Sequence, residues 1–77
     1  MEKKRTLAGL SIGETAVVKE VRGESSITKR LMEMGIIPGV SIEVIKTAPF
    51  GSPIQVRLRG YNLAIRRNEA EFVEIIP

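Results

Sequence analysis

The side chains best suited to metal binding occur in one short segment of the sequence. They are Glu20, Glu24, Met32, Glu33 and Met34. Hard carboxylate oxygens and soft thioether sulfurs suit different ions, and the spacing of these residues forms no recognisable ligand set. We therefore interpret the glutamates as surface acids and the methionines as apolar packing groups. The sequence predicts no metal site formed by this chain alone.

Four arginines in the second half of the chain could form a basic stripe. They are Arg57, Arg59, Arg66 and Arg67. The first two would share one face of a strand, and the third would lie on a neighbouring strand, as on barrels that bind oligonucleotides. Such binding also needs aromatic side chains on which bases stack, and the chain has only two Phe and one Tyr. We favour a solvated outer face, balanced by Glu69, Glu71 and Glu74, over nucleic-acid binding.

Composition excludes several classes of function. The 77 residues include no Cys and no His, which excludes disulfides, typical zinc sites, Cys nucleophiles and an imidazole base. The glycines occur singly, so neither the P-loop nor the dinucleotide fingerprint fits. A chain of this length forms one small domain with little volume for a closed active site. We predict a protein that is not an enzyme and that uses no cofactor.

The formal charge of +3 arises from 12 basic and 9 acidic residues. Part of the excess lies in residues 1–5, which we expect to be a disordered basic N-terminus preceding a single domain at 6–77. No stretch approaches the roughly 20 apolar residues that span a bilayer, so we expect no direct membrane insertion. The absence of cysteine and of a secretory signal fits a reducing cytoplasm.

The segment from 25 to 39 predicts a short helix that is followed by a strand. Ser25 or Ser26 can cap the first turn, and Gly35 can adopt the left-handed conformation that ends a helix. The helix would run from about 26 to 34. Its apolar face has residues at spacings of four and three, which are Ile27, Leu31 and Met34. About three turns are too few to be stable alone, so this face must pack against the rest of the chain.

Most of the remaining chain predicts short strands with apolar alternation. We expect strands at 15–22, 40–46, 54–59, 61–66 and 72–76, a short edge strand or arm with a turn at 6–14, and one helical turn at 67–70. The loop 47–53 is long enough for a wide hairpin. About five short antiparallel strands favour a mainly β fold, a small five-stranded barrel with one inserted helix that caps an end or lies outside.

The same helix and the 47–53 loop predict a surface for a partner. Leu31 and Met34 favour the core, and Phe50 could equally anchor the loop on the barrel. Yet the helix and loop offer more apolar surface than a small barrel needs, and methionines are common where proteins bind partners. The predicted partner-binding residues are Lys29, Arg30, Leu31, Met32, Met34, Pro49, Phe50 and Gly51, with the two cations setting orientation through charge.

These residues carry a resemblance to a known family. The runs KRLMEMGIIPG and APFGSP, the late IRR and the earlier Leu7, Leu10, Gly13 and Glu14 pattern resemble the ferrous iron transport protein A (FeoA) family over residues 7–76. Ser52 replaces the Asp that many members have. The resemblance implies an SH3-like barrel that is also fused to iron-dependent repressors, and transition-metal binding at the family level.

The resemblance further implies a cytoplasmic accessory role in bacterial ferrous iron uptake. The expected partner is the membrane permease with a GTPase domain, ferrous iron transport protein B, so that the protein would lie at the inner face of the membrane through its partner. Two alternatives from other classes stay open at this point. One is a small basic barrel that binds nucleic acid, and the other is a carrier that itself binds ferrous iron.

Overall fold

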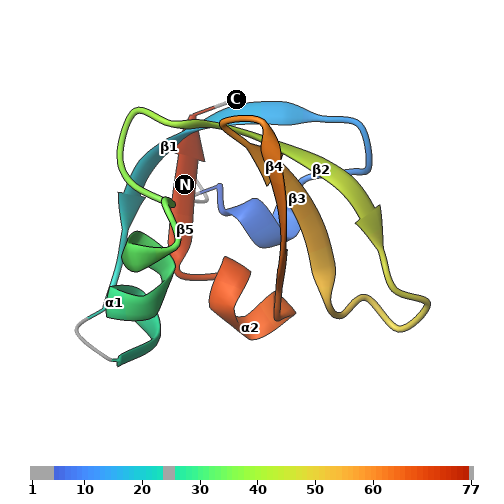
Figure 1. Cartoon of the computed structure of the whole chain (residues 1–77). Helices are drawn as coiled ribbons and strands as arrows, with labels where there is room; N and C mark the ends of the chain where they lie inside the picture. Colours follow the sequence, from blue (N-terminus) through green and yellow to red (C-terminus); the bar gives the residue numbers. More distant parts are fainter. Residues whose placement is uncertain (1–4, 24–25, 77) are drawn as a thin grey trace, which may run out of the picture.

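The computed structural model describes residues 5–23 and 26–76, and it contains one antiparallel sheet of five strands (Figure 1). The strands are β1 (Thr15–Val21), β2 (Ser41–Thr47), β3 (Ile54–Leu58), β4 (Tyr61–Ile65) and β5 (Val73–Ile76). Their order in the sheet is β4-β3-β2-β1-β5. The helical elements are the 3-10 turn η1 (Leu7–Gly9), α1 (Ser26–Glu33) and α2 (Arg67–Ala70). The predicted mainly β fold with one inserted helix is confirmed.

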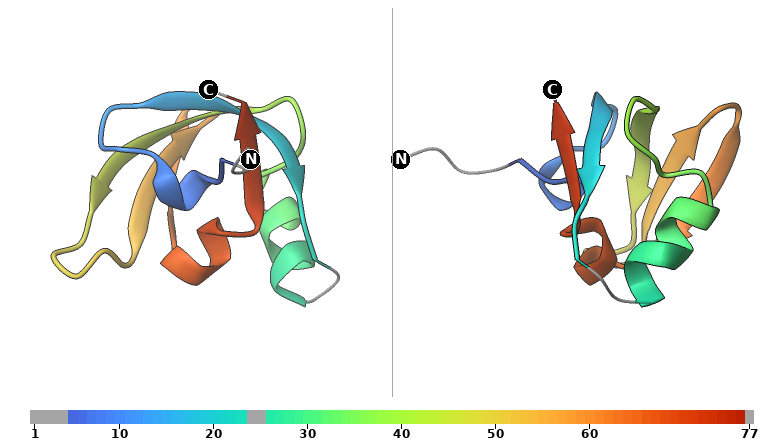
Figure 2. Two further views of the ribbon diagram at one scale, coloured as in Figure 1. Left: turned by 180° about the vertical axis from the view of Figure 1, so that it is seen from behind. Right: turned by 90° about the vertical axis from the view of Figure 1, so that its left-hand side faces the viewer.

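The sheet curves around a core built from the residues that alternate along its strands. Figure 2 shows α1 and α2 beside each other at one end of this curved sheet. The predicted inward faces of β2 and β3 are buried, because successive side chains of a strand point to opposite sides. The buried strand residues include Ile42, Val44, Ile54, Val56 and Leu58. Burial of this apolar surface is the main force that holds five short strands together.

The end of α1 is determined by a glycine, as the sequence predicts. Gly35 has φ +102°, and the amide of Ile36 donates to the carbonyl of Leu31 at 3.1 Å while the amide of Gly35 donates to Met32 at 3.0 Å. This pair of hydrogen bonds is the Schellman motif, which satisfies carbonyls left open at the end of a helix. The start of α1 is tied to the preceding segment, because the Thr28 hydroxyl donates to the carbonyl of Arg22 at 2.7 Å.

The expected edge strand or arm at 6–14 is wrong in its first half. Leu7–Gly9 form a 3-10 turn, and the only strand-like pairing there is a single bridge between Thr6 and Glu74. Leu7 and Ala8 are both buried, and consecutive residues of a strand cannot bury side chains on the same face, whereas a helical turn can. The expected turn at Ile12 and Gly13 is present. Residues 1–4 lie outside the described residues, and the carbonyl of Arg5 accepts a hydrogen bond from Ile75 at 3.0 Å.

A two-residue turn joins β3 to β4. Arg59 and Gly60 have φ +49° and +83°, which is the pattern of a type I′ turn, and Leu58 pairs with Tyr61. The predicted placement of Arg59 on the same strand face as Arg57 is therefore wrong, because β3 ends at Leu58. Arginine has a Cβ that makes this left-handed conformation unfavourable.

Replacement of this arginine should stabilise the fold. We expect Arg59→Asn to raise the free energy of unfolding by about 0.5–1 kcal/mol, because asparagine tolerates the left-handed conformation and favours type I′ turns. Urea denaturation of the two proteins measures the difference. Arg57→Asn, within β3, is the matched control, and an equal gain there would show that loss of charge rather than turn geometry is responsible.

Candidate docking surface

The structure divides the predicted helix residues between the core and the surface. Leu31 has no exposed surface and contacts the core, so its inclusion in a docking surface is wrong. Its side chain lies on the face of α1 that packs against the core, as the apolar spacing of the helix predicts. Met34 is partly buried against the same core. Met32 is 44% exposed, and it is the apolar side chain that α1 presents to solvent.

The two cations of α1 differ in their surroundings. Lys29 is exposed, whereas Arg30 pairs with the carboxylate of Glu69 and so joins α1 to α2. The other oxygen of Glu69 accepts a hydrogen bond from the amide of Arg66 at 2.9 Å. Glu69 is buried, so its prediction as a solvated acid is wrong. Arg30 therefore has an ion-pair partner within the chain, whereas Lys29 is exposed to solvent.

A second buried carboxylate lies near the segment that precedes the first turn of α1. Glu74 on β5 is buried and accepts a hydrogen bond from Arg22 at 2.6 Å. Its prediction as a solvated acid is wrong, since β5 buries Glu74 as well as Val73 and Ile75. Arg22 also offers its carbonyl to Thr28. These contacts hold the segment that leads into α1 against β5, and they give α1 a defined position beside the sheet.

The hairpin loop between β2 and β3 presents an aromatic side chain to water. Phe50 is 98% exposed, so its alternative role as an anchor of the loop does not hold. The loop is itself ordered by hydrogen bonds, from Gly51 to the carbonyl of Ala48 at 2.8 Å and from Ala48 to that of Pro53 at 3.1 Å. Its connection of two strands as a wide hairpin is as predicted. Pro49 is exposed beside Phe50.

The helix and the loop do not form one continuous patch. In both the front and the back view, α2 lies between α1 and the β2–β3 loop (Figures 1 and 2). The contacts agree, because Arg30 of α1 pairs with Glu69 of α2, and the amide of Arg67 in α2 donates to the Ser52 hydroxyl of the loop at 3.2 Å. Met32 and Phe50 are thus two separate apolar points on either side of α2.

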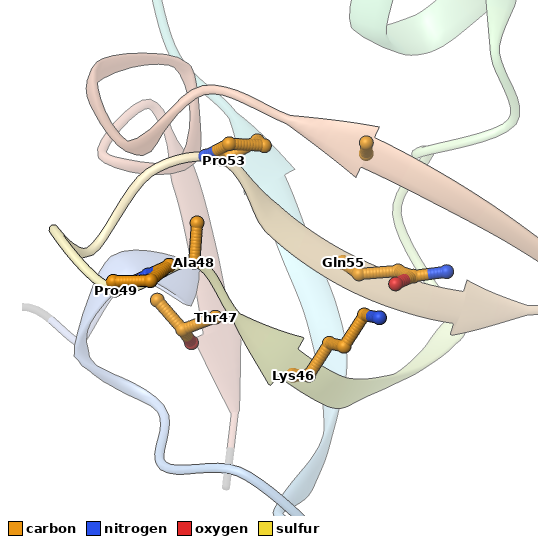
Figure 3. A pocket seen from close by; sticks show the side chains of 7 residues that line it. Lys46, Thr47, Ala48, Pro49, Pro53 and Gln55 are labelled. Atoms are coloured by element: carbon orange, nitrogen blue, oxygen red, sulfur yellow. The ribbon is translucent and has the colours of Figure 1, made fainter.

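A shallow hollow adjoins the loop on the outer face of the sheet (Figure 3). Its volume is about 330 Å³, and its lining residues are Lys46, Thr47, Ala48, Pro49, Pro53, Gln55 and Ala64. Lys46 and Gln55 are cross-strand partners after a bulge in β2, and Ala64 pairs with Gln55 on the other side. The polar groups of its lining are the Lys46 amine, the Thr47 hydroxyl and the Gln55 amide, and the lining includes no carboxylate.

The part of the chain that contains β3 and β4 is rich in cations. Residues 44–68 contain five of the twelve cations and none of the nine anions, so the rest of the chain has a net charge of −2. Within the described ranges, no ion pair is formed by the cations of this segment. Arg57 donates to the side chain of Asn62 at 3.2 Å. The arginines of this segment are those from which the sequence suggested a basic stripe, whereas the absence of acids was not predicted, although a charge count along the chain reveals it.

Other kinds of site find no support in the described part of the chain. It contains no group of three or more acidic, His or Cys side chains placed to hold a metal ion. Glu24, one of the residues considered for such a group, lies outside the described residues. No helix in residues 5–23 and 26–76 has the length and apolar character needed to cross a membrane.

The sheet order and the inserted helix define a small SH3-like domain. An FeoA domain model matches residues 5–77, so the chain belongs to the FeoA family. An FeoA-like protein from Clostridium acetobutylicum has a TM-score of 0.89 at 36% identity, over 99% of this chain and 88% of that one. FeoA from Stenotrophomonas maltophilia, described as an SH3 domain protein in complex with zinc, has a TM-score of 0.82 at 29% identity, over 94% of this chain and 89% of that one.

One relative joins the domain to a transporter. The Fe(2+) transport protein A/Fe(2+) transporter FeoB fusion protein of Porphyromonas gingivalis is 36% identical over 69 residues, which are 90% of this chain and 8% of that protein. The chain therefore corresponds to a small part of that relative. A manganese-dependent transcriptional repressor shares the fold alone, at 17% identity with a TM-score of 0.86 over 99% of this chain and 37% of the repressor chain.

Proposed function

We propose that this protein is a non-enzymatic accessory protein of bacterial ferrous iron uptake that docks on the cytoplasmic part of the membrane permease FeoB. Membership of the FeoA family supports a role in ferrous iron uptake. The fused relative from Porphyromonas gingivalis supports FeoB as the partner, because fusion keeps the two parts at high effective concentration. The proposed contact residues on the loop are Pro49, Phe50 and Gly51. Those on the helix are Lys29, Met32 and the exposed part of Met34.

The exposure of Phe50 is the observation that supports this proposal most strongly. A fully solvated phenylalanine forgoes about 1.5–3 kcal/mol that burial would provide, and the hydrogen bonds within the loop hold it away from the core. Aromatic side chains are enriched at protein interfaces, where a few anchors dominate the binding energy. Met32 adds a flexible apolar contact on the far side of α2.

Docking of this kind could regulate the permease by differential affinity. A partner that binds one nucleotide state of a GTPase more tightly than another necessarily shifts the population toward that state. The contact would be modest in area, below about 1,200 Å² in total, which suits a transient interaction. Docking on the permease would hold the protein at the inner face of the membrane.

Substitution of Phe50 tests the proposed function. We expect Phe50→Glu to raise the dissociation constant for the detergent-solubilised permease at least tenfold, because the variant loses an apolar anchor and buries a charge. Met32→Glu should raise it by a smaller factor. Biolayer interferometry with the purified, full-length proteins measures both constants.

The matched control is Ile12→Glu. Ile12 is 62% exposed on the turn before β1, so this variant also exchanges an exposed apolar side chain for a carboxylate. Its dissociation constant for the permease should stay within twofold of that of the unsubstituted protein. Full affinity of both the Phe50 and the Met32 variants, with native spectra, would rule out this docking surface.

A further inference from the structure

One margin of the sheet ends in a strand with a free edge. β4 is the first strand in the order β4-β3-β2-β1-β5, and in the right-hand view of Figure 2 it lies at the side of the sheet opposite β5. The edge of β5 is covered in part by Arg5 and Thr6. Most helical contacts lie elsewhere, because α1 packs on β1 and α2, and η1 packs on β5 and α2, while β4 meets the end of α1 through the Tyr61 hydroxyl.

The hydrogen-bonding register identifies which backbone groups face outward. The two-residue turn makes Leu58 and Tyr61 a hydrogen-bonded pair, so alternate residues of β4 bond to β3. Asn62 and Ala64 then direct their N–H and C=O groups away from β3. No backbone partner for these groups occurs in the described ranges, and both residues are exposed. Such a row of open donors and acceptors can accept another strand.

Cations lie close to this edge, one on the neighbouring strand and one at each end of β4. Arg57 is the cross-strand partner of Asn62, and Arg59 and Arg66 flank the two ends of β4. Glu43 lies across from Arg57 on β2, away from the edge, and no ion pair joins them. A second copy of the chain would bring like charges together if it added its own β4, which is destabilising. An acidic strand would meet opposite charges instead.

The other face of the edge is apolar. Leu63 is partly buried against the core, and Tyr61 is 42% exposed with its hydroxyl donating to the carbonyl of Met34 at the end of α1. Side chains of an added strand alternate between the two faces. Those on the inner side would therefore meet Leu63 and Tyr61, and those on the outer side would meet arginine. Over Ala64, a long side chain could also extend toward Gln55 in the hollow.

We propose that the free edge of β4 binds an extended peptide segment with alternating acidic and apolar residues, which adds to the sheet as a further strand. Backbone hydrogen bonds to Asn62 and Ala64 supply affinity, and the arginines select for acidic residues. Nucleic acid cannot use the edge in this way, because it lacks the regular alternation of amide donors and acceptors. The site is separate from Phe50 and does not depend on the proposed function.

Peptide binding followed by NMR tests this inference. The probe is a peptide of about eight residues, a typical strand length, with alternating valine and glutamate. We expect hydrogen exchange of the Asn62 and Ala64 amides to slow at least tenfold at saturation. The same peptide with N-methyl groups on the residues that face the edge should bind at least tenfold more weakly, because it keeps every side chain but loses the backbone donors.

Three protein variants sharpen the test. Arg66→Glu and Ala64→Pro should each weaken binding at least tenfold, the second because proline removes an edge N–H that β3 does not use. Lys19→Glu, an equal charge reversal at an exposed residue of β1, should change affinity less than twofold. Phe50→Glu should also bind normally, which separates this site from the docking surface.

Several results would overturn the inference. Equal binding of the N-methylated peptide would show that charge alone is responsible, and unchanged exchange at Asn62 and Ala64 would place the peptide elsewhere. Tighter binding of a single-stranded oligonucleotide of the same charge would assign the arginines to nucleic acid. Protection of the same two amides by self-association, seen as a dimer in sedimentation, would assign the edge to a second copy.

Discussion

Leu31→Ala is expected to lower the free energy of unfolding by about 2–5 kcal/mol, the range measured for truncation of fully buried leucines. Leu31 has no exposed surface, and its side chain joins α1 to the hydrophobic core. Domains of this size are stable by roughly 5–15 kcal/mol. The loss is therefore a large fraction of the total, and urea denaturation followed by circular dichroism measures it.

The neighbouring Met32 provides the matched control. Met32→Ala should change stability by less than about 0.5 kcal/mol, as usual for surface positions, although it removes a side chain of similar size from the same helix turn. If Leu31→Ala leaves too little folded protein to measure, Leu31→Met keeps the volume and should cost less than about 1.5 kcal/mol. Equal costs for Leu31→Ala and Met32→Ala would contradict the division of α1 into a core side and a surface side.

Gly35→Ala is the second substitution with a large expected effect, a loss of about 2–4 kcal/mol. Gly35 has φ +102°, a conformation that strains residues with a Cβ. The added Cβ would also lie 2.5 Å from the Tyr61 hydroxyl and 3.5 Å from Leu58. The Tyr61 ring would have to move and give up its hydrogen bond to the carbonyl of Met34.

A double-mutant cycle separates the two causes. In a Tyr61→Phe background the hydrogen bond is already absent, so Gly35→Ala should cost about 1 kcal/mol less there. Gly39→Ala is the control for backbone strain alone, since Gly39 has φ +93° and its added Cβ meets nothing within 4 Å. If Gly35→Ala were no more costly than Gly39→Ala, the contact with Tyr61 would have no role in stability.

Helix boundaries and strand faces were predictable because they depend on neighbouring residues. The end of α1 just before Gly35 and the inward faces of β2 and β3 follow from short sequence patterns and backbone geometry. The 3-10 turn at Leu7 was missed, since its apolar residues fit a strand equally well until their burial is known. The family followed from motifs spread over nearly the whole chain, and the domain match confirms it.

The candidate site could be predicted only in part. Met32, Pro49 and Phe50 are exposed as a docking surface requires, whereas Leu31 is in the core and Arg30 pairs with Glu69. Sequence spacing places Leu31 and Met32 side by side but does not say how wide the buried stripe of α1 is. That width depends on how closely the sheet curves around the helix.

The sequence by itself determined the class of fold, the ends of α1, the alternation of the strands and the absence of acids from residues 44–68. The tertiary structure alone decided that Glu69 and Glu74 are buried, that α2 separates Met32 from Phe50, and that β4 is left at an open edge. The physical reason is the separation along the chain over which each interaction acts. Periodicity and turn preferences act over a few residues, whereas the pairing of buried charges and the order of strands depend on contacts between residues far apart in the chain.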